Sequence, residues 1–269
     1  MKIQTLVAAV NQDVRTLAER MQMETDAIIV NQCDAFGYET YEYQGHQIQC
    51  YSFQERGVGL NRNNALLRAD GDICLFSDED IRYDEGYREK IEQEFRQHPQ
   101  ADVILFNFRV NPQRRTYYNT KFGRVRWYNC GRYPTFCAAI RRKEVIKAGV
   151  TFSLLFGGGA PYSNGEDSLF FMDCMRKGLK VYKSPIELGE EIPRESTWFS
   201  GYNRKFFYDR GYLYHFLYGR LALLFGLRFV YTKKKTICQD IPAKQAFAYL
   251  KQGIHDAGHK EEDCSSVTD

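Results

Sequence analysis

The chain has 269 residues, of which 43% are hydrophobic and 26% are charged. These proportions are typical of a globular protein and exclude a collagen-like, coiled-coil or disordered chain. The formal net charge of +3 gives no indication of a polyanionic partner.

The small net charge conceals an uneven distribution of basic and aromatic residues. Residues 106–136 contain seven Lys or Arg and no acid, and residues 196–235 contain eight against one Asp. Each segment therefore carries a net charge of about +7, and the other 198 residues together carry about −11. The same two segments contain 22 of the 40 aromatic residues. Basic, aromatic side chains are thus concentrated in two parts of the chain.

The cysteines and the N-terminus indicate the compartment. The eight cysteines include no C-x-x-C pair, so neither a zinc site nor a disulfide framework is expected. The N-terminal stretch MKIQTLVAAVNQ has too short an apolar run for a secretory signal, and no small-residue cleavage site follows it. We therefore expect a cytoplasmic protein.

The first 110 residues alternate between apolar runs and helical periodicity. Such an alternation predicts an open α/β sheet, mostly parallel, with helices on its faces. Ligands of these sheets bind beyond the carboxyl ends of the strands. Strands are predicted at 3–10, 27–30, 73–76 and 103–108, a strand or hairpin at 41–53, and helices at 14–21, 61–69 and 87–95.

The second half is less regular. A glycine-rich stretch at 157–165 predicts a loop, and the polar residues 256–269 predict a disordered tail. The other expected elements are strands at 135–140 and 180–183, a short helix at 141–149, a helix at 166–177 and a helical region at 206–231.

Three successive carboxylates, Asp78, Glu79 and Asp80, follow the strand ICLF. Such groups repel one another and need a cation or hydrogen-bond donors to stay ionised together. Mg²⁺ or Mn²⁺ with substrate phosphates would satisfy them. A solvated acidic turn is the alternative.

A second acidic pair, Glu166 and Asp167, lies between the glycine-rich loop and a helix. Acids in a first helical turn often serve only as caps, because the helix dipole favours them there. Alternatively, a carboxylate at this junction acts as a general base toward an acceptor hydroxyl.

Taken in order, these motifs resemble glycosyltransferase family 2, which has the GT-A fold. The stretch RGVGLNRNNALLRADGDICLFSDEDIRYDEGY resembles its donor-binding core, with Gly57, Arg62-Asn63 and the acidic triplet in place. NGEDSLFFMDCMRKGLKVYKSP resembles the family's Gly-Glu-Asp helix. ESTWF and FFYDRGYLY resemble the C-terminal region of a bacterial branch that builds surface polysaccharides. Two departures are Gly59-Leu60 in place of Ser-Arg and Glu79 at the centre of the triplet.

The resemblance implies a GT-A fold with a Rossmann-like, mostly parallel sheet and a C-terminal helical extension. It implies a metal-dependent, inverting glycosyltransferase of the hexosyltransferase type, which moves a sugar from a nucleotide diphosphate sugar, in the first place a UDP-sugar. The acceptor would be a hydroxyl of a saccharide or a lipid-linked saccharide in polysaccharide biosynthesis. The expected parts are 1–110 for the nucleotide sugar, 111–205 for the acceptor and the catalytic helix, 206–255 for the helical region and 256–269 for the tail.

The resemblance also assigns roles to residues. Asp167 is the expected base, with Glu166 orienting the acceptor or capping the helix. Asp80 and Asp78 would hold Mn²⁺ or Mg²⁺. Expected donor contacts are Asn11, Asn31, Gln32, Asp34, Gly57, Arg62, Asn63, Asp78 and Glu79, and expected acceptor contacts are Gly158, Gly159 and Trp198.

Two other functions remain open from the sequence. A nucleotidyltransferase would share the sheet and the carboxylates but leave the Gly-Glu-Asp helix without a role. A non-catalytic nucleotide-sugar-binding protein is conceivable because of Gly59-Leu60.

The two basic segments have alternatives of their own. Segment 109–133 interleaves Arg with aromatic residues, as proteins that bind single-stranded nucleic acid do. No nucleic-acid motif accompanies it, so we expect either a long solvated loop or an acceptor-side loop, and no nucleic acid. Residues 212–231 reach the length of a membrane span, but His215, Arg220 and Arg228 interrupt them. They predict either a helix packed on the catalytic part or one lying on an anionic membrane surface, which would be the inner face of the cell membrane.

Overall fold

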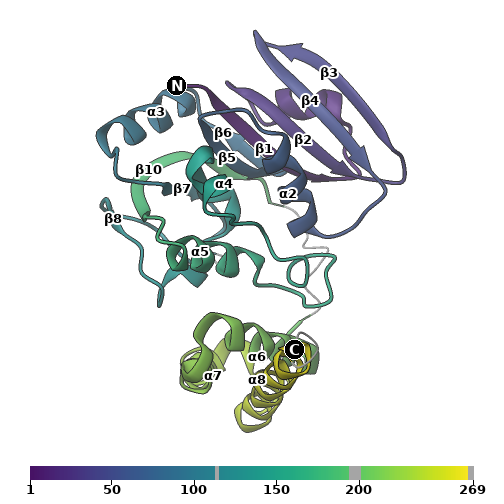
Figure 1. Cartoon of the computed structure of the whole chain (residues 1–269), viewed down its shortest axis with the longest axis vertical. Coiled ribbons are helices and arrows are strands. Elements are labelled where there is room, and N and C mark those ends of the chain that lie inside the picture. The colour runs from purple at the N-terminus through teal and green to yellow at the C-terminus, as the bar shows by residue number, and fades with distance from the viewer. Residues whose placement is uncertain (113–114, 194–200, 266–269) are drawn as a thin grey trace.

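The computed structural model describes residues 1–112, 115–193 and 201–265, with side chains up to residue 259. A single sheet forms its centre, with strands in the order β3-β4-β2-β1-β5-β9-β7-β10-β6 and β8 paired with β10 (Figure 1). The strands are β1 (Ile3–Val10), β2 (Asp26–Gln32), β3 (Gly37–Tyr43), β4 (His46–Phe53), β5 (Ile73–Asp78), β6 (Ile81–Tyr83), β7 (Val103–Arg109), β8 (Gly123–Arg124), β9 (Ala138–Arg141) and β10 (Val181–Glu191). The helices are α1 (Val14–Arg20), α2 (Val58–Arg68), α3 (Tyr87–Gln97), α4 (Arg142–Lys147), α5 (Glu166–Arg176), α6 (Arg204–Tyr218), α7 (Ala222–Ile237) and α8 (Ala243–Ser265), with 3₁₀ turns η1 (Cys130–Arg132), η2 (Thr135–Cys137) and η3 (Gly219–Leu221).

The sheet is mostly parallel, as the alternation of elements predicts. β1 pairs in parallel with β2 and β5, β2 with β4, and β7 with β10. Because β9 is antiparallel to both β5 and β7, six of the ten strands in the described residues run in one direction. β1 is buried almost throughout, since it has a parallel partner on each side and helices cover both faces. The α/β fold class is confirmed.

The register of the central strands creates the ligand edge. Val10 at the end of β1 lies opposite Gln32 at the end of β2, and Ala8 lies opposite Asp78 at the end of β5. The carboxyl ends of these three strands therefore meet at one place. Residues more than 60 positions apart in the sequence become neighbours there.

The boundaries differ from the sequence predictions in three places. The 41–53 region is a hairpin of β3 and β4 whose tight turn has Gln44 and Gly45 at positive φ. The segment predicted as a strand at 135–140 begins instead as the turn η2, and only then becomes β9. β10 continues to Glu191, well past the predicted 180–183, because the chain beyond the apolar part goes on to pair with β7 and β6.

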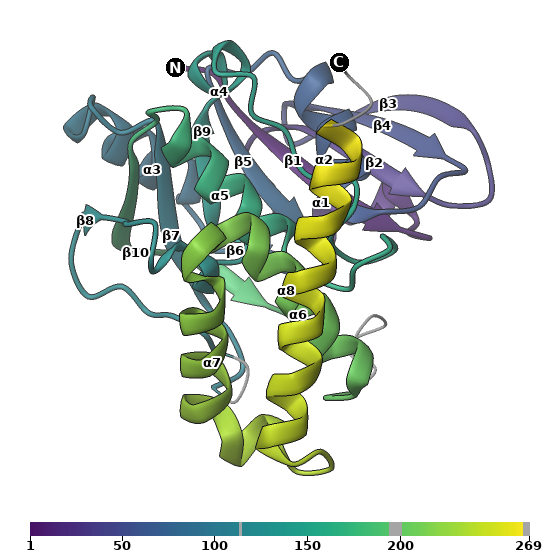
Figure 2. The same ribbon diagram turned by 60° about the horizontal axis from the view of Figure 1, so that its bottom comes forward.

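The prediction of a disordered tail from residue 256 is wrong as far as residue 265, because α8 continues through it. Three fully buried residues of α8, Ala246, Leu250 and Ala257, recur at helical spacing and face α6 and α7. Figure 2 shows α8 running alongside α6. Gly211 of α6 and Gly253 of α8 lie at the crossing, where an added Cβ would overlap a backbone carbonyl of the other helix. Small residues here bring the two backbones together.

The C-terminal helices are attached to the α/β part of the chain through α6. The buried carboxylate of Asp209 accepts the backbone N–H of Ser163 at 2.9 Å and also pairs with Lys205. Tyr212 stacks on Tyr162 with ring centroids 4.1 Å apart. From α5, Arg176 donates to the carbonyls of Phe216 and Leu217 at the end of α6. α6 thus fixes the glycine-rich loop and α5 from one side.

Substituting Gly211 by Ala tests this crossing. The added Cβ overlaps the Leu250 carbonyl, so α8 must shift, and we expect a loss of about 1–3 kcal/mol in the free energy of unfolding. Gly258→Ala is the matched control, because its Cβ would meet only the His215 ring at 3.5 Å and Ala favours the helix. Urea denaturation measures both. Equal stability of the two variants would contradict the close crossing.

Candidate active site

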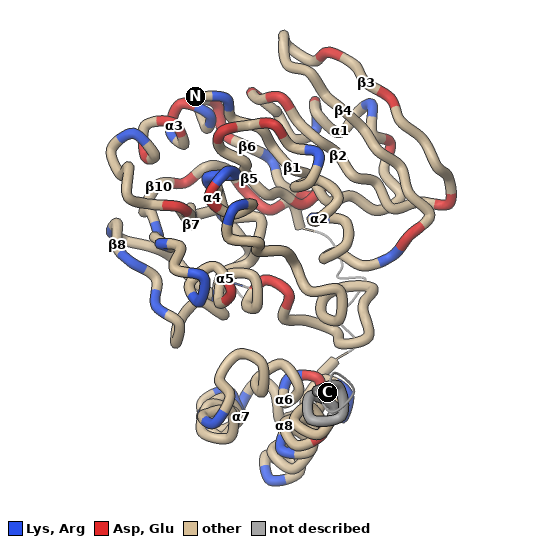
Figure 3. Tube along the Cα trace, in the orientation of Figure 1, with Lys and Arg blue, Asp and Glu red and all other residues tan. Residues whose placement is uncertain are grey.

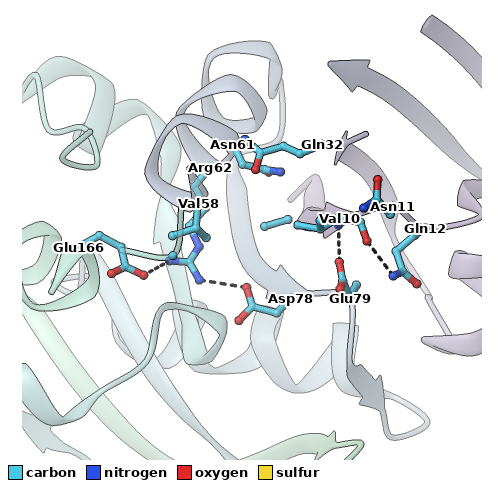
Figure 4. Close-up of a pocket in the computed structure, with 12 residues that line it drawn as sticks. Val10, Asn11, Gln12, Gln32, Val58, Asn61, Arg62, Asp78, Glu79 and Glu166 are labelled. Atoms are coloured by element: carbon cyan, nitrogen blue, oxygen red, sulfur yellow. Dashed lines mark hydrogen bonds and ion pairs between the residues drawn. The ribbon is translucent and has the colours of Figure 1, made fainter. Parts of the chain in front are cut away.

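A cavity of about 380 Å³ opens at the carboxyl ends of β1, β2 and β5 (Figure 4). Its walls come from the strand ends, from the start of α2 and from the loop and first turn of α5. The lining residues are Ala8, Val10, Asn11, Gln12, Gln32, Val58, Asn61, Arg62, Asp78, Glu79, Gly158 and Glu166. This volume is in the range of small-molecule sites.

Arg62 is the centre of the site. Its guanidinium is 5% exposed and donates to Asp78 Oδ1 at 3.0 Å, to Glu166 Oε1 at 3.1 Å and to Asp167 Oδ1 at 3.0 Å. Burial by itself would lower the pKa of Arg62, but the charges of the three carboxylates outweigh it and raise that pKa. A single cation therefore joins α2, the end of β5 and the start of α5. The sequence predicted all four residues as site residues, and the structure brings them together.

Glycines allow the elements around the Arg62 cluster to pack closely together. Gly57 precedes α2 with φ +117°, and the N–H of the next residue, Val58, donates to the carbonyl of Gly158 at 2.9 Å. A Cβ on Gly157 would lie 2.8 Å from the Glu166 carboxylate and 2.7 Å from a methyl of Val58. The glycine-rich loop can therefore lie directly against both helix starts, as no larger residue would allow.

Asp167 has the electrostatic properties of a base. Burial, reinforced by the charge of Glu166, raises its pKa from the usual value to about 7, although Arg62 opposes the shift. The hydroxyl of Thr135, from η2, donates to the same oxygen that Arg62 contacts. The side chain keeps 28% of its surface accessible. Asp167 is therefore fixed in place and reachable, and it titrates near neutral pH, as a general base requires.

The acidic triplet divides into different roles. Arg62 holds Asp78 at the cavity wall, whereas buried Glu79 accepts the backbone N–H of Val10 at 2.6 Å. Asp80 lies in the turn after β5, where its carbonyl accepts from Ile192, and it is not among the cavity-lining residues. In the described part of the chain no cluster of three His, Cys, Asp or Glu side chains is arranged for a metal ion. The residues present fit a Mg²⁺ or Mn²⁺ ion that takes one carboxylate, from Asp78, and its other ligands from substrate phosphates.

Beside the ends of β1 and β2, amide side chains shape the cavity. Asn31 bonds both backbone groups of Gln12 and so fixes the turn after β1, where Asn11 has φ +51°. Gln32 donates to the Gly57 carbonyl at 3.1 Å. Asn61 donates to the carbonyls of Ala9 and Val30, which leaves its buried Oδ1 without a hydrogen-bond partner in the described residues. That oxygen is a ready acceptor for a ligand N–H or O–H.

Several predicted contacts lie elsewhere. The Asp34 side chain is 93% exposed and pairs with Arg56 outside the cavity. Asn63 exchanges two hydrogen bonds with the backbone of Phe152, so it fixes that segment and does not line the cavity. Gly159 is exposed beside Gly158, which alone of the two lines the cavity. Trp198 lies outside the described residues.

Sequence reasoning missed Thr135, Asn61 and Gln12. Thr135 carries no sequence signal, because only the fold brings η2 to the start of α5. Asn61 could have been noticed, since it directly precedes Arg62 in the quoted motif and is polar at a buried helix position.

The α/β sheet with this cavity at its strand ends defines a protein of the GT-A fold class. The model of the family described as Glycosyl transferase family 2 matches residues 14–150, and the chain belongs to this family. It is thus a glycosyltransferase.

Solved structures share the fold at low sequence identity. S. aureus TarS (residues 1–349) in complex with UDP-GlcNAc matches with a TM-score of 0.59 and 14% identity over 94% of this chain and 72% of that one. The same TarS fragment in complex with UDP gives a TM-score of 0.58 and 14% identity over 94% and 71%. The mannosyltransferase PcManGT from Pyrobaculum calidifontis, in complex with GDP-Man and Mn²⁺, gives 0.54 and 11% over 95% and 86%. No curated protein matches.

Replacing Arg62 by Met tests the central cation. Three carboxylates then face one another unpaired, and we expect a loss of about 3–5 kcal/mol in the free energy of unfolding. Because Arg62 lowers the pKa of Asp167, its removal raises that pKa further above 7. In the folded variant Asp167 therefore stays protonated to a higher pH than in the folded wild type, whereas in the unfolded chain it is ionised. The free energy of unfolding of the variant then falls more steeply with pH, so its loss of stability relative to the wild type grows as the pH rises from 6 to 8.

Thermal unfolding at several pH values measures this. Arg68→Met on the same helix is the control, since Arg68 is exposed, donates to Asn64 and lies over the ring of Tyr51. A destabilisation independent of pH would contradict the electrostatic origin.

Proposed function

We propose that the protein is an inverting, divalent-metal-dependent glycosyltransferase that uses a nucleotide diphosphate sugar. The observation that carries the proposal is the Arg62 cluster, which holds Asp167, with its pKa of about 7, beside a cavity at the strand ends. The accessible carboxylate, the shared cation and the acidic strand end are the groups that such a transfer needs.

In this mechanism Asp167 is the base. The acceptor hydroxyl oxygen forms a bond to the anomeric carbon of the sugar from the side opposite the diphosphate, whose bond to that carbon breaks. The hydroxyl proton passes to the carboxylate of Asp167, and the configuration at the anomeric carbon inverts. Arg62 keeps part of Asp167 ionised, while Thr135 fixes the direction of its carboxylate.

We propose that Asp78 holds Mn²⁺ or Mg²⁺ at the diphosphate, without Asp80, which the sequence predicted as a ligand but which does not line the cavity. When bound, the ion would offset the negative charge that develops on the leaving nucleoside diphosphate. The Mn²⁺ in the mannosyltransferase complex, a protein of the same fold, supports this assignment.

A UDP-sugar is the proposed donor, and a saccharide or lipid-linked saccharide the proposed acceptor, in polysaccharide biosynthesis in the cytoplasm. The TarS complexes with UDP and UDP-GlcNAc support the donor class. Asn11, Gln32 and Asn61 are the proposed contacts to the nucleoside, because their amides line the cavity. Gly158, which lines the same cavity, is the proposed contact to the acceptor.

The base assignment predicts the effect of Asp167→Asn. The amide cannot take a proton, so transfer falls by at least about 10²-fold, while donor binding changes little. Wild-type kcat/KM rises with pH through about 7, because only ionised Asp167 accepts a proton. Initial rates with calorimetric donor titration measure both, and a variant that retains transfer would disprove the assignment.

The donor and metal proposals predict the ligand response. A UDP-sugar with Mn²⁺ should raise the unfolding temperature more than a GDP-sugar with Mn²⁺ or a UDP-sugar with chelator, since Asp78 would hold the ion and the ion would offset the charge of the diphosphate. A thermal-shift panel of nucleotide diphosphate sugars with and without Mn²⁺ measures this. Asp34→Asn is the control, because that carboxylate lies outside the cavity. A panel in which UDP-sugars never exceed GDP-sugars would contradict the UDP proposal.

A further inference from the structure

The two faces of α7 differ sharply. Ala222, Gly226 and Val230, four residues apart, face inward and are buried, and Gly226 lies against Leu250 of α8. The opposite face is apolar but open to solvent. It carries Leu223, Leu224, Leu227 and Tyr231, between 40% and 66% exposed, and Leu221 of η3 is 45% exposed just before it. Soluble proteins rarely leave so many large apolar side chains exposed side by side.

The other basic, aromatic segment joins this surface. Trp127 packs against Tyr218 of α6 and Phe225 of α7, with ring centroids 6.4 Å and 5.8 Å apart. Trp127 itself is 43% exposed, and its neighbour Tyr128 is 55% exposed. The two segments that stand out in the sequence thus meet in space. We call the exposed side chains of Leu221, Leu223, Leu224, Leu227, Tyr231, Trp127 and Tyr128 the α7 surface.

Positive charge borders the α7 surface. The stretch 219–237 contains five basic residues, Arg220, Arg228 and Lys233–Lys235, and no acid. On the helix, Arg228 and Lys235 follow Leu224 and Tyr231 by four residues each, so they border the apolar stripe along its length. Figure 3 shows basic residues along the β8 segment and on α7. Apolar and aromatic side chains bordered by Lys and Arg are typical of helices that lie on anionic membranes.

A membrane-crossing role fits the structure less well. The helical run Arg204–Ile237 is long and apolar enough for a span by length and composition, the one such run in the described residues. However, a third of its most apolar window is buried inside the protein, and Gly219 with φ +50° breaks the helical path. Asp209, buried in α6, anchors the glycine-rich loop. α6 is therefore part of the protein core, whereas the outer face of α7 is open to a membrane.

We propose that the α7 surface docks the protein on an anionic lipid bilayer, with α7 lying in the plane of the interface. A second copy of the chain is the weaker candidate, because two α7 surfaces would bring like charges together, whereas anionic lipids complement them. Helix α5 connects the C-terminal helices to the site. Arg176 at its C-terminal end contacts α6, and Asp167 lies nine residues earlier, about 14 Å from Arg176 along the helix axis. The inference goes beyond the proposed function and does not depend on which acceptor is used.

Co-sedimentation of the full chain with vesicles tests the proposal. We expect binding to vesicles of phosphatidylcholine with phosphatidylglycerol, weaker binding at high salt, and little binding to phosphatidylcholine alone. Two multiple variants should each lower the bound fraction at least about tenfold. One is the double variant Leu224→Glu with Leu227→Glu, and the other is the triple variant Arg228→Gln with Lys234→Gln and Lys235→Gln. Leu67→Glu is the matched control, because Leu67 is a 66% exposed leucine on α2, away from α7. Wild-type-like binding by both multiple variants would overturn the proposal.

Two measurements separate docking from misfolding and from self-association. Trp127 fluorescence should shift to the blue with anionic vesicles, and Trp127→Phe should remove that shift while the protein still binds. Light scattering after size-exclusion chromatography reports the oligomer. One pair of results would overturn the proposal. If the wild type is a dimer that the double variant Leu224→Glu with Leu227→Glu dissociates, and the wild type does not bind vesicles, the α7 surface belongs to a second copy of the chain.

Discussion

A single buried cation holds the active site together. Arg62 on α2 pairs with Asp78 at the end of β5 and with Glu166 and Asp167 at the start of α5. Charges of this kind are costly to bury unless each is paired, so the three elements must meet in one arrangement. The close approach of these three elements also requires glycine at two neighbouring positions. Gly57 turns the chain into α2, and Gly157 leaves the space in which the Glu166 carboxylate lies.

The two halves of the site have different supports. One wall is made by the sheet, whose parallel register fixes the strand ends and the amides that line them. Another wall includes the glycine-rich loop 157–165, which belongs to no helix or strand that could hold its geometry. α6 supplies the missing support, because Asp209 binds the loop and Arg176 ties α5 to the end of α6. The C-terminal helices therefore have a structural role in the site as well as forming an exposed surface.

The acidic and the basic side chains of the chain lie in different parts of the structure. Carboxylates gather where Arg62 and, as we propose, a divalent ion offset them. The excess of Lys and Arg lies on the β8 segment and on α7, where it borders exposed aromatic and aliphatic side chains. A net charge of +3 is thus the sum of two separate environments.

The sequence by itself determined the α/β class and the approximate positions of the central strands, and it predicted as site residues Arg62, Asp78, Glu166 and Asp167, which meet in the structure. These depend on local signals, namely apolar runs, glycine breaks and short motifs. Only the tertiary structure decided which predicted residues reach the cavity. Asp34 follows a strand end and Asn63 lies in the donor-binding motif, but they bond to Arg56 and to the Phe152 backbone. Three further features depend on contacts between distant segments. They are the hydrogen bond from Thr135 to Asp167, the helix α8 in place of the expected tail, and the contact of Trp127 with Phe225. Periodicity and local motifs carry no information about such contacts, since packing between whole elements creates them.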